Sequence, residues 1–161
     1  MRVSDRSKAL GNWGEQKALM LLTRAGFQPV RDLNAEVANH PFADVFAARG
    51  PQKYIVGVRT RNKNTAAGPL NSPYNVCTKG VDLFWLESRY DAHLACLALQ
   101  VDVEAQLFSA FFATLAQVNA SGIRYSIPMT AKATVRYECL ARSEHDPSIR
   151  LEWTNQKVLI H

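Results

Sequence analysis

The sequence predicts a single α/β domain spanning residues 1–161. A helical pattern near the N-terminus is followed by three short strand-like segments, and two long apolar segments occupy the second half of the chain. A chain of 161 residues has the size of one domain with room for a sizeable core. Hydrophobic residues make up 47% and charged residues 20%, as in ordinary globular proteins. No repeat or linker divides the chain, so we expect one domain.

The first predicted element is an amphipathic helix over residues 7–25. Gly26 is well placed to end it. Gly11 and Gly14 are poor helix formers, so we expect them to allow close approach to another element. The apolar residues recur at steps of three and four and form one stripe: Leu10, Trp13, Ala18, Leu21, Leu22 and Ala25.

Three strand-like segments follow, over residues 27–33, 42–48 and 53–61. Pro29 favours an edge position for the first of them. The residues between the second and the third, 49–52, read as a turn because they contain Gly and Pro. A helix followed by a meander of strands is therefore the expected opening motif.

The rest of the chain predicts a loop, a second helix and further strands. The loop is the polar stretch rich in Asn, Gly and Pro at residues 62–75, and the helix covers residues 80–90. Residues 93–101 and 107–118 read as buried strands, with a helix over 104–116 as the alternative for the latter. Further strands are expected at residues 123–129, 133–140 and 149–153.

Composition narrows the function classes. No apolar run approaches the roughly 18 to 20 residues of a membrane-spanning helix, and the polar N-terminus argues against secretion, so we expect a cytoplasmic protein. Cys77, Cys96 and Cys139 form no metal-binding or disulfide pattern, and we expect Cys96 to be a buried, inert thiol. The net charge of +5 permits attraction to a polyanion, although no helix-turn-helix, zinc-finger or RNA-recognition signature is present.

Asp44 is the residue that most needs an explanation. A charge inside an apolar strand costs several kcal/mol unless it is paired or bound to a metal. Glu15 is an isolated acid on the first helix, and Arg59 lies near the end of the third strand. In one interpretation these residues form a site. In the alternative, Asp44 pairs with Arg59 across adjacent strands without any chemistry, and Glu15 is a solvated helix residue.

These segments resemble the core of the PD-(D/E)xK nucleases, which include restriction endonucleases and archaeal-type Holliday junction resolvases. The resemblance rests on GNWGE at residues 11–15, FADV at 42–45 and YIVGVRTR at 54–61, and it covers roughly residues 7–63. It implies a restriction endonuclease-like core with a mixed central β-sheet flanked by helices and with additional C-terminal strands. It also implies a Mg²⁺-dependent phosphodiesterase that acts on DNA, and it allows a homodimer.

Carried over residue by residue, Glu15 matches the helical acid and Asp44 the metal-binding aspartate. Gly57 stands where the family has its second acid, and Arg59 stands where it has its lysine. Two carboxylates normally hold the Mg²⁺ ion, and Gly57 offers none. Arginine stays protonated, so Arg59 can stabilise charge but is a poor general base. We therefore expect a degenerate, catalytically impaired site, with a non-enzymatic binding or assembly module as the alternative.

A relocated residue would restore the site. Glu87 on the second helix is the first candidate for the missing metal-binding acid, and Glu36 and Asp82 are weaker ones. Lys53 and Lys63 are the candidates for the lysine.

A basic cluster around the third strand predicts contacts with DNA phosphates. We expect Arg61, Lys63 and Lys79 to bind the backbone and Tyr74 to stack on bases. Arg31 and Lys53 come before the loop that follows this strand. The alternative is an ordinary solvated edge, in which long basic side chains cover apolar surface.

Overall fold

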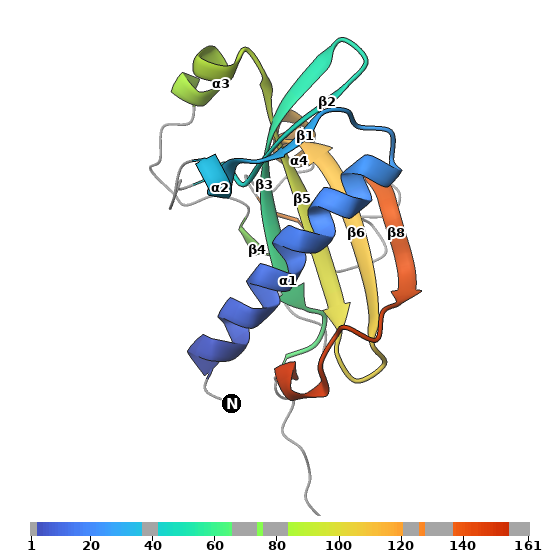
Figure 1. Cartoon of the computed structure of the whole chain (residues 1–161). Helices are drawn as coiled ribbons and strands as arrows, with labels where there is room; N and C mark the ends of the chain where they lie inside the picture. Colours follow the sequence, from blue (N-terminus) through green and yellow to red (C-terminus); the bar gives the residue numbers. More distant parts are fainter. Residues whose placement is uncertain are drawn as a thin grey trace, which may run out of the picture.

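A six-stranded mixed β-sheet forms the centre of the computed structural model, which describes residues 3–36, 42–65, 74–75, 84–120, 126–127 and 137–154 (Figure 1). The strand order is β1-β2-β3-β5-β6-β8. Strands β3 and β5 run parallel, and the other neighbouring pairs are antiparallel. The strands are β1 (Val30–Asp32), β2 (Val45–Arg49), β3 (Gln52–Asn62), β5 (His93–Asp102), β6 (Leu107–Thr114) and β8 (Glu138–His145). The expected α/β class with a mixed central sheet is confirmed.

Helix α1 (Val3–Arg24) lies along one face of this sheet (Figure 1). Its stripe of Leu10, Leu21 and Leu22 belongs to a core that includes Val56 and Val58 of β3. The helix predicted over residues 7–25 is confirmed, with a start four residues earlier.

The opposite face of the sheet carries a second core. Leu86 of α3 (Phe84–Tyr90) and Leu115 of α4 (Leu115–Ala120) pack there with Ile55 of β3 and Phe42. Because side chains alternate between the faces of a strand, β3 contributes Val56 and Val58 to one core and Ile55 to the other. A short helix, α2 (Leu33–Glu36), connects β1 to the segment before β2.

Gly14 allows α1 to approach β3 closely. A Cβ atom at Gly14 would overlap Oγ1 of Thr60, so nothing larger than glycine fits without a shift of the backbone or of Thr60. The close approach expected at this residue is therefore confirmed. The same expectation is wrong for Gly11, where a Cβ atom would meet no heavy atom of the described chain within 4 Å.

Most of the remaining predictions hold, with shifted bounds. Residues 107–118 form strand β6 and then begin α4, so neither the strand nor the helix interpretation was right for the whole segment. The predicted loop at 62–75 ends in β4 (Tyr74–Asn75), which pairs with β7 (Ser126–Ile127) in a separate two-stranded sheet. The strand expected at 133–140 is observed as β8 at Glu138–His145; residues 133–136 lie outside the described part.

The strand predicted at residues 149–153 is wrong, because Leu151–Trp153 form a 3₁₀-helix, η1. Asp146 folds the chain back before this point: its carboxylate accepts hydrogen bonds from the backbone N–H and the hydroxyl of Ser148, and its carbonyl accepts one from Ile149 N–H. The resulting turn buries Ile149 and Trp153 against the core beneath α1. The apolar residues are thus buried without the extended backbone that their pattern suggested.

In the described residues, none of the helices has both the length and the apolar character needed to cross a membrane.

Candidate functional site

Asp44 lies directly before β2 and is only 8% exposed. Its backbone N–H donates to the carbonyl of Val56, which continues the ladder between β2 and β3. Its carboxylate is hydrogen-bonded at both oxygens: Oδ2 accepts the backbone N–H of Val58 at 2.7 Å, and Oδ1 accepts Nδ2 of Asn34 at 3.0 Å. These bonds offset the cost of burying the charge.

Arg59 supplies the opposite charge. Its Nη1 donates to Oδ2 of Asp44 at 3.3 Å and to the carbonyl of Val58 at 2.8 Å. Its guanidinium carbon also lies 5.9 Å from the ring centre of Phe42, within the range of a cation–π contact. The pairing of Asp44 with Arg59, which the sequence offered as one of two interpretations, is therefore present.

The position of the expected second acid, Gly57, is closed by Phe42. A Cβ atom at Gly57 would lie 2.8 Å from Cε2 of the Phe42 ring and 3.0 Å from the Phe42 carbonyl oxygen. Phe42 itself is 1% exposed and packed in the core on this face. A carboxylate side chain at residue 57 would therefore require Phe42 to move.

Glu15 is half-buried on α1 beside the same group of charges. Burial raises the pKa of the Glu15 carboxyl above its usual value, and the negative charges of Asp44 and Asp32 raise it further. The positive charge of Arg59 and a hydrogen bond from Asn34 act in the opposite direction. Glu15 is thus not the fully solvated helix residue of the alternative interpretation.

The structure adds two residues that the sequence did not single out. Asn34, in α2, hydrogen-bonds to both Glu15 and Asp44 and so links the two acids. Asp32, at the end of β1, accepts the backbone N–H of Asn34 at 3.0 Å and thereby orients it. The spacing Asp-x-Asn after a strand is typical of a local turn, and this was the available signal.

The donor set does not fit a Mg²⁺ ion. Magnesium prefers octahedral coordination with oxygen ligands from carboxylates and water. Both oxygens of Asp44 already accept hydrogen bonds, the positive charge of Arg59 lies next to one of them, and Gly57 offers no ligand. Among the residues that the structure describes, no three His, Cys, Asp or Glu side chains form a group suited to a metal.

The candidate for the missing acid, Glu87, lies on α3. Its Oε1 accepts the backbone N–H of Leu94 at the start of β5, at 3.4 Å. Its role as a metal ligand with Asp44 stays a prediction. Of the weaker candidates, Glu36 ends α2, and Asp82 lies outside the described residues.

The structure describes the side chains of only some of the predicted DNA-binding residues. Arg61 follows Arg59 on the same face of β3, and Lys63 is exposed just beyond the strand. The side chain of Tyr74 and the whole of Lys79 lie outside the described part of the chain.

Two other basic residues stand apart from the end of β3. Lys53 is at the opposite end of this strand, where its ammonium lies 3.8 Å from the Asp91 carboxylate. Arg31 is exposed on β1 with its guanidinium over Phe46.

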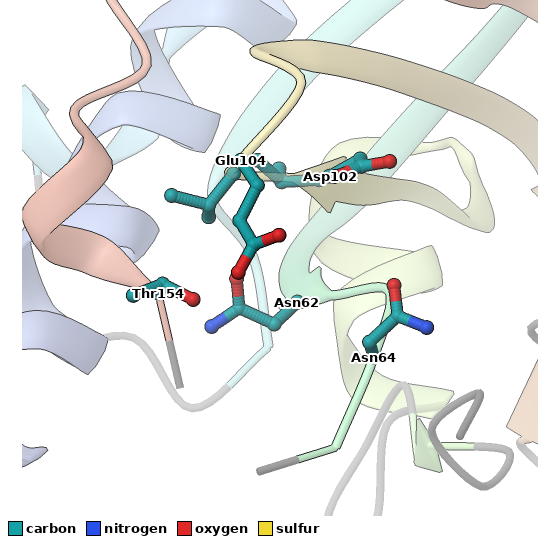
Figure 2. A pocket seen from close by; sticks show the side chains of 7 residues that line it. Asn62, Asn64, Asp102, Glu104 and Thr154 are labelled. Atoms are coloured by element: carbon teal, nitrogen blue, oxygen red, sulfur yellow. The ribbon is translucent and has the colours of Figure 1, made fainter. Parts of the chain in front are cut away.

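A small polar pocket lies where β3 and β5 end, beyond Arg61 (Figure 2). Its volume of about 10 Å³ is that of a single water-sized space, so it is too small for a substrate. The residues that line it are Asn62, Asn64, Val101, Asp102, Val103, Glu104 and Thr154.

No protein-family model matches the chain, and no curated protein matches it. Among solved structures it is similar to Hjc of Archaeoglobus fulgidus, a Holliday junction resolvase from an archaeal hyperthermophile, with a TM-score of 0.52 and 16% sequence identity. The match covers 76% of this chain and 89% of that one. At this identity the likeness establishes the fold: the chain has a restriction endonuclease-like α/β core.

Proposed function

We propose that this protein binds DNA with a nuclease fold whose metal-dependent chemistry is impaired. The observation that carries the proposal is the ion pair between Arg59 and Asp44. It occupies the place where the resemblance to PD-(D/E)xK nucleases expects a carboxylate and a lysine around a metal ion. The fold shared with a Holliday junction resolvase supports DNA as the ligand.

The impairment follows from the side chains present. A phosphodiesterase of this kind needs a metal to polarise the phosphate and a group that accepts a proton from water. Arg59 stays protonated, Gly57 has no side chain, and Asp44 is engaged at both oxygens. A relocated acid, with Glu87 as the first candidate, would have to complete the metal site for cleavage to occur.

The affinity for DNA would come from the basic residues at the end of β3. Arg59, Arg61 and Lys63 follow one another along this segment, and the whole chain carries a net charge of +5. Lysine and arginine side chains neutralise backbone phosphates without reading the base sequence, and the resulting affinity falls as salt rises. Lys79 and Tyr74 would extend this surface.

The test is to incubate the purified protein with supercoiled, linear and branched DNA, with Mg²⁺ or Mn²⁺, and to measure cleavage and binding in parallel. We expect binding that weakens with salt and no cleavage. Cleavage that disappears in Asp44→Ala would show an active nuclease and contradict the impairment. An affinity that does not change with salt would contradict the phosphate-binding surface.

The second candidate function is a non-enzymatic assembly module, and the closed position at Gly57 favours it. This candidate predicts neither cleavage nor salt-dependent DNA affinity, but a stable homodimer or a protein complex. Sedimentation of the purified chain in the same buffer separates the two candidates.

A further inference from the structure

We infer that Arg59 takes the place of a metal ion in this fold, and that its guanidinium binds one phosphate group of the DNA backbone directly, without a divalent cation. The inference rests on the proposed DNA binding and names the chemical group that the site recognises.

One side of the Arg59 guanidinium is fixed by the protein. Nη1 is shared between Oδ2 of Asp44 and the carbonyl of Val58, and the ring of Phe42 lies beneath the group. Asp44 is in turn held by Val58 N–H and by Asn34. The arginine is therefore oriented before any ligand arrives, which lowers the entropic cost of binding.

The other side of the guanidinium is open. In the described part of the chain, neither Nε nor Nη2 of Arg59 makes a hydrogen bond, and the side chain keeps 27% of its surface exposed. Parallel N–H groups on one edge of a guanidinium match two oxygens of a phosphate. A charged, pre-oriented and unengaged edge of this kind is suited to a phosphodiester oxyanion.

Phe42 couples the two departures from the nuclease pattern. Its ring supports Arg59 and also fills the space that a side chain at Gly57 would need. The loss of the second acid and the gain of an arginine are thus parts of one arrangement. A guanidinium at 3.3 Å from Asp44 supplies the positive charge that a metal would otherwise bring to the phosphate.

The charges around Arg59 are not positive on balance, so this group of side chains does not by itself attract DNA. Asp44 offsets the charge of Arg59, and the acids Glu15 and Asp32 lie on the neighbouring elements. Attraction to the DNA as a whole must therefore come from Arg61 and Lys63 further along the chain. In this arrangement Arg59 positions one phosphate, while its neighbours supply most of the long-range attraction.

The experiment measures the affinity of the full chain for a labelled DNA duplex, in EDTA and in Mg²⁺ at matched ionic strength, over a range of salt. The variants are Arg59→Gln, which keeps an N–H donor for Asp44 without the charge, and Arg59→Lys, which keeps the charge without the planar fork. Arg24→Ala is the matched control, because this arginine also pairs with an acid, Glu144 of β8, and lies at the C-terminal end of α1. Circular dichroism checks that each variant is folded.

We expect equal affinity in EDTA and in Mg²⁺. Arg59→Gln should weaken binding severalfold and lower the slope of log affinity against log salt by about 1, the loss of one phosphate contact. Arg59→Lys should be intermediate, and Arg24→Ala should leave the slope unchanged.

Three results would overturn the inference, and they differ in what they say of DNA binding. Wild-type binding that requires Mg²⁺ refutes the metal-independent site but leaves the proposed function in place. Wild-type binding that Arg59→Gln does not alter refutes the role of Arg59 and also leaves that function. An absence of any wild-type binding refutes the proposed function and the inference together.

Discussion

Asp44 shows how far a single residue can be interpreted from sequence. A buried charge needs a partner, and this argument correctly led to Arg59 as one possibility. It could not show that the Phe42 ring closes the position of Gly57, because that contact joins residues on neighbouring segments whose distance is set by the register of β2 and β3. The contribution of Asn34 was hidden for the same reason, since it depends on where α2 places its side chain.

The contact between Gly57 and Phe42 predicts a penalty for any side chain at residue 57. Gly57→Ala should lower the free energy of unfolding by about 1–3 kcal/mol, the usual cost of overpacking a core, because the new Cβ atom meets both the ring and the carbonyl of Phe42. Urea denaturation measures the change. Gly11→Ala is the control: it enters open space within α1 and should be neutral or stabilising by up to about 1 kcal/mol. Equal effects at the two glycines would show that the Phe42 contact is not tight.

Glu15 predicts a stability that depends on pH. Burial and the nearby acids raise its pKa in the folded state above the ordinary value of 4.5, so the folded protein holds this proton more tightly than the unfolded chain does. The wild type therefore loses stability as pH rises from about 4.5 through the folded-state pKa. Glu15→Gln keeps an acceptor for Asn34 and removes the charge.

This variant should be more stable than the wild type at neutral pH, and the difference should vanish as pH falls below 4.5. Thermal unfolding of both proteins across this range measures it. A difference that stays constant with pH would place Glu15 outside the cluster of acids.

At the level of elements, the sequence predicted whether a segment forms a helix or a strand better than it predicted the residues at which that element begins and ends. The 3.6-residue period located α1, and the β-branched run located β3, because both patterns are properties of local sequence. The strand predicted at residues 149–153 was wrong, since the apolar residues there are buried by a turn that a side chain stabilises and not by a strand. Asp146 makes that turn, and a carboxylate's choice of hydrogen-bond partners cannot be inferred from hydrophobic periodicity.

Asp146 also joins this turn to α1, because its carboxylate pairs with the ammonium group of Lys17. This contact predicts the effect of replacing Asp146. Burial opposes its ionisation, but hydrogen bonds from Lys17 and Ser148 together hold the pKa of Asp146 below its usual 3.8. Its contribution to stability is therefore present above pH 3.8 and is lost as pH falls through the lower folded-state value. Asp146→Ala should cost about 1.5–3 kcal/mol at neutral pH, the range for hydrogen bonds to a charged group.

Chemical denaturation at pH 7 and at pH 3 measures this contribution, and the difference between the two proteins should shrink at the lower pH. Arg150→Ala is the control, because it removes an exposed charge on the same segment that forms a local ion pair with Glu152. A loss from Arg150→Ala as large as that from Asp146→Ala would contradict the anchoring role.

At the scale of the whole molecule, the order of the strands follows from no local pattern. The sequence indicated the parts of a mixed sheet, and the resemblance over residues 7–63 implied their arrangement. The placement of β8 beside β6, and the way the sheet curls around the end of α1, depend on contacts between distant residues. Phe27 shows this curl: its ring meets both Tyr54 of β3 and Phe112 of β6 on the side of the sheet that α1 covers.

The curl brings together Arg49 at the end of β2 and Glu138 at the start of β8, which are four strands apart in the sheet. Two parallel hydrogen bonds of 2.7 and 2.6 Å join the side chains, and the Arg49 guanidinium lies 4.3 Å from the ring centre of Phe27. The hydrogen bond from Arg49 lowers the pKa of Glu138, although burial acts against it. This pair therefore acts as a clamp between the two sides of the curled sheet.

Because both side chains of the clamp are more than one-third exposed, solvent screens the pair, and we expect a coupling of only about 0.5–1 kcal/mol. A double-mutant cycle with Arg49→Lys and Glu138→Gln, followed by urea denaturation, isolates this coupling from the effect of each single change. Lysine keeps the charge but cannot form the two parallel bonds, so Arg49→Lys alone should already lower the free energy of unfolding by most of this amount. In 1 M salt the coupling energy should be smaller than in low salt, since screening acts on exposed charges. A coupling near zero in low salt would mean that packing around Phe27, rather than this ion pair, sets the curl of the sheet.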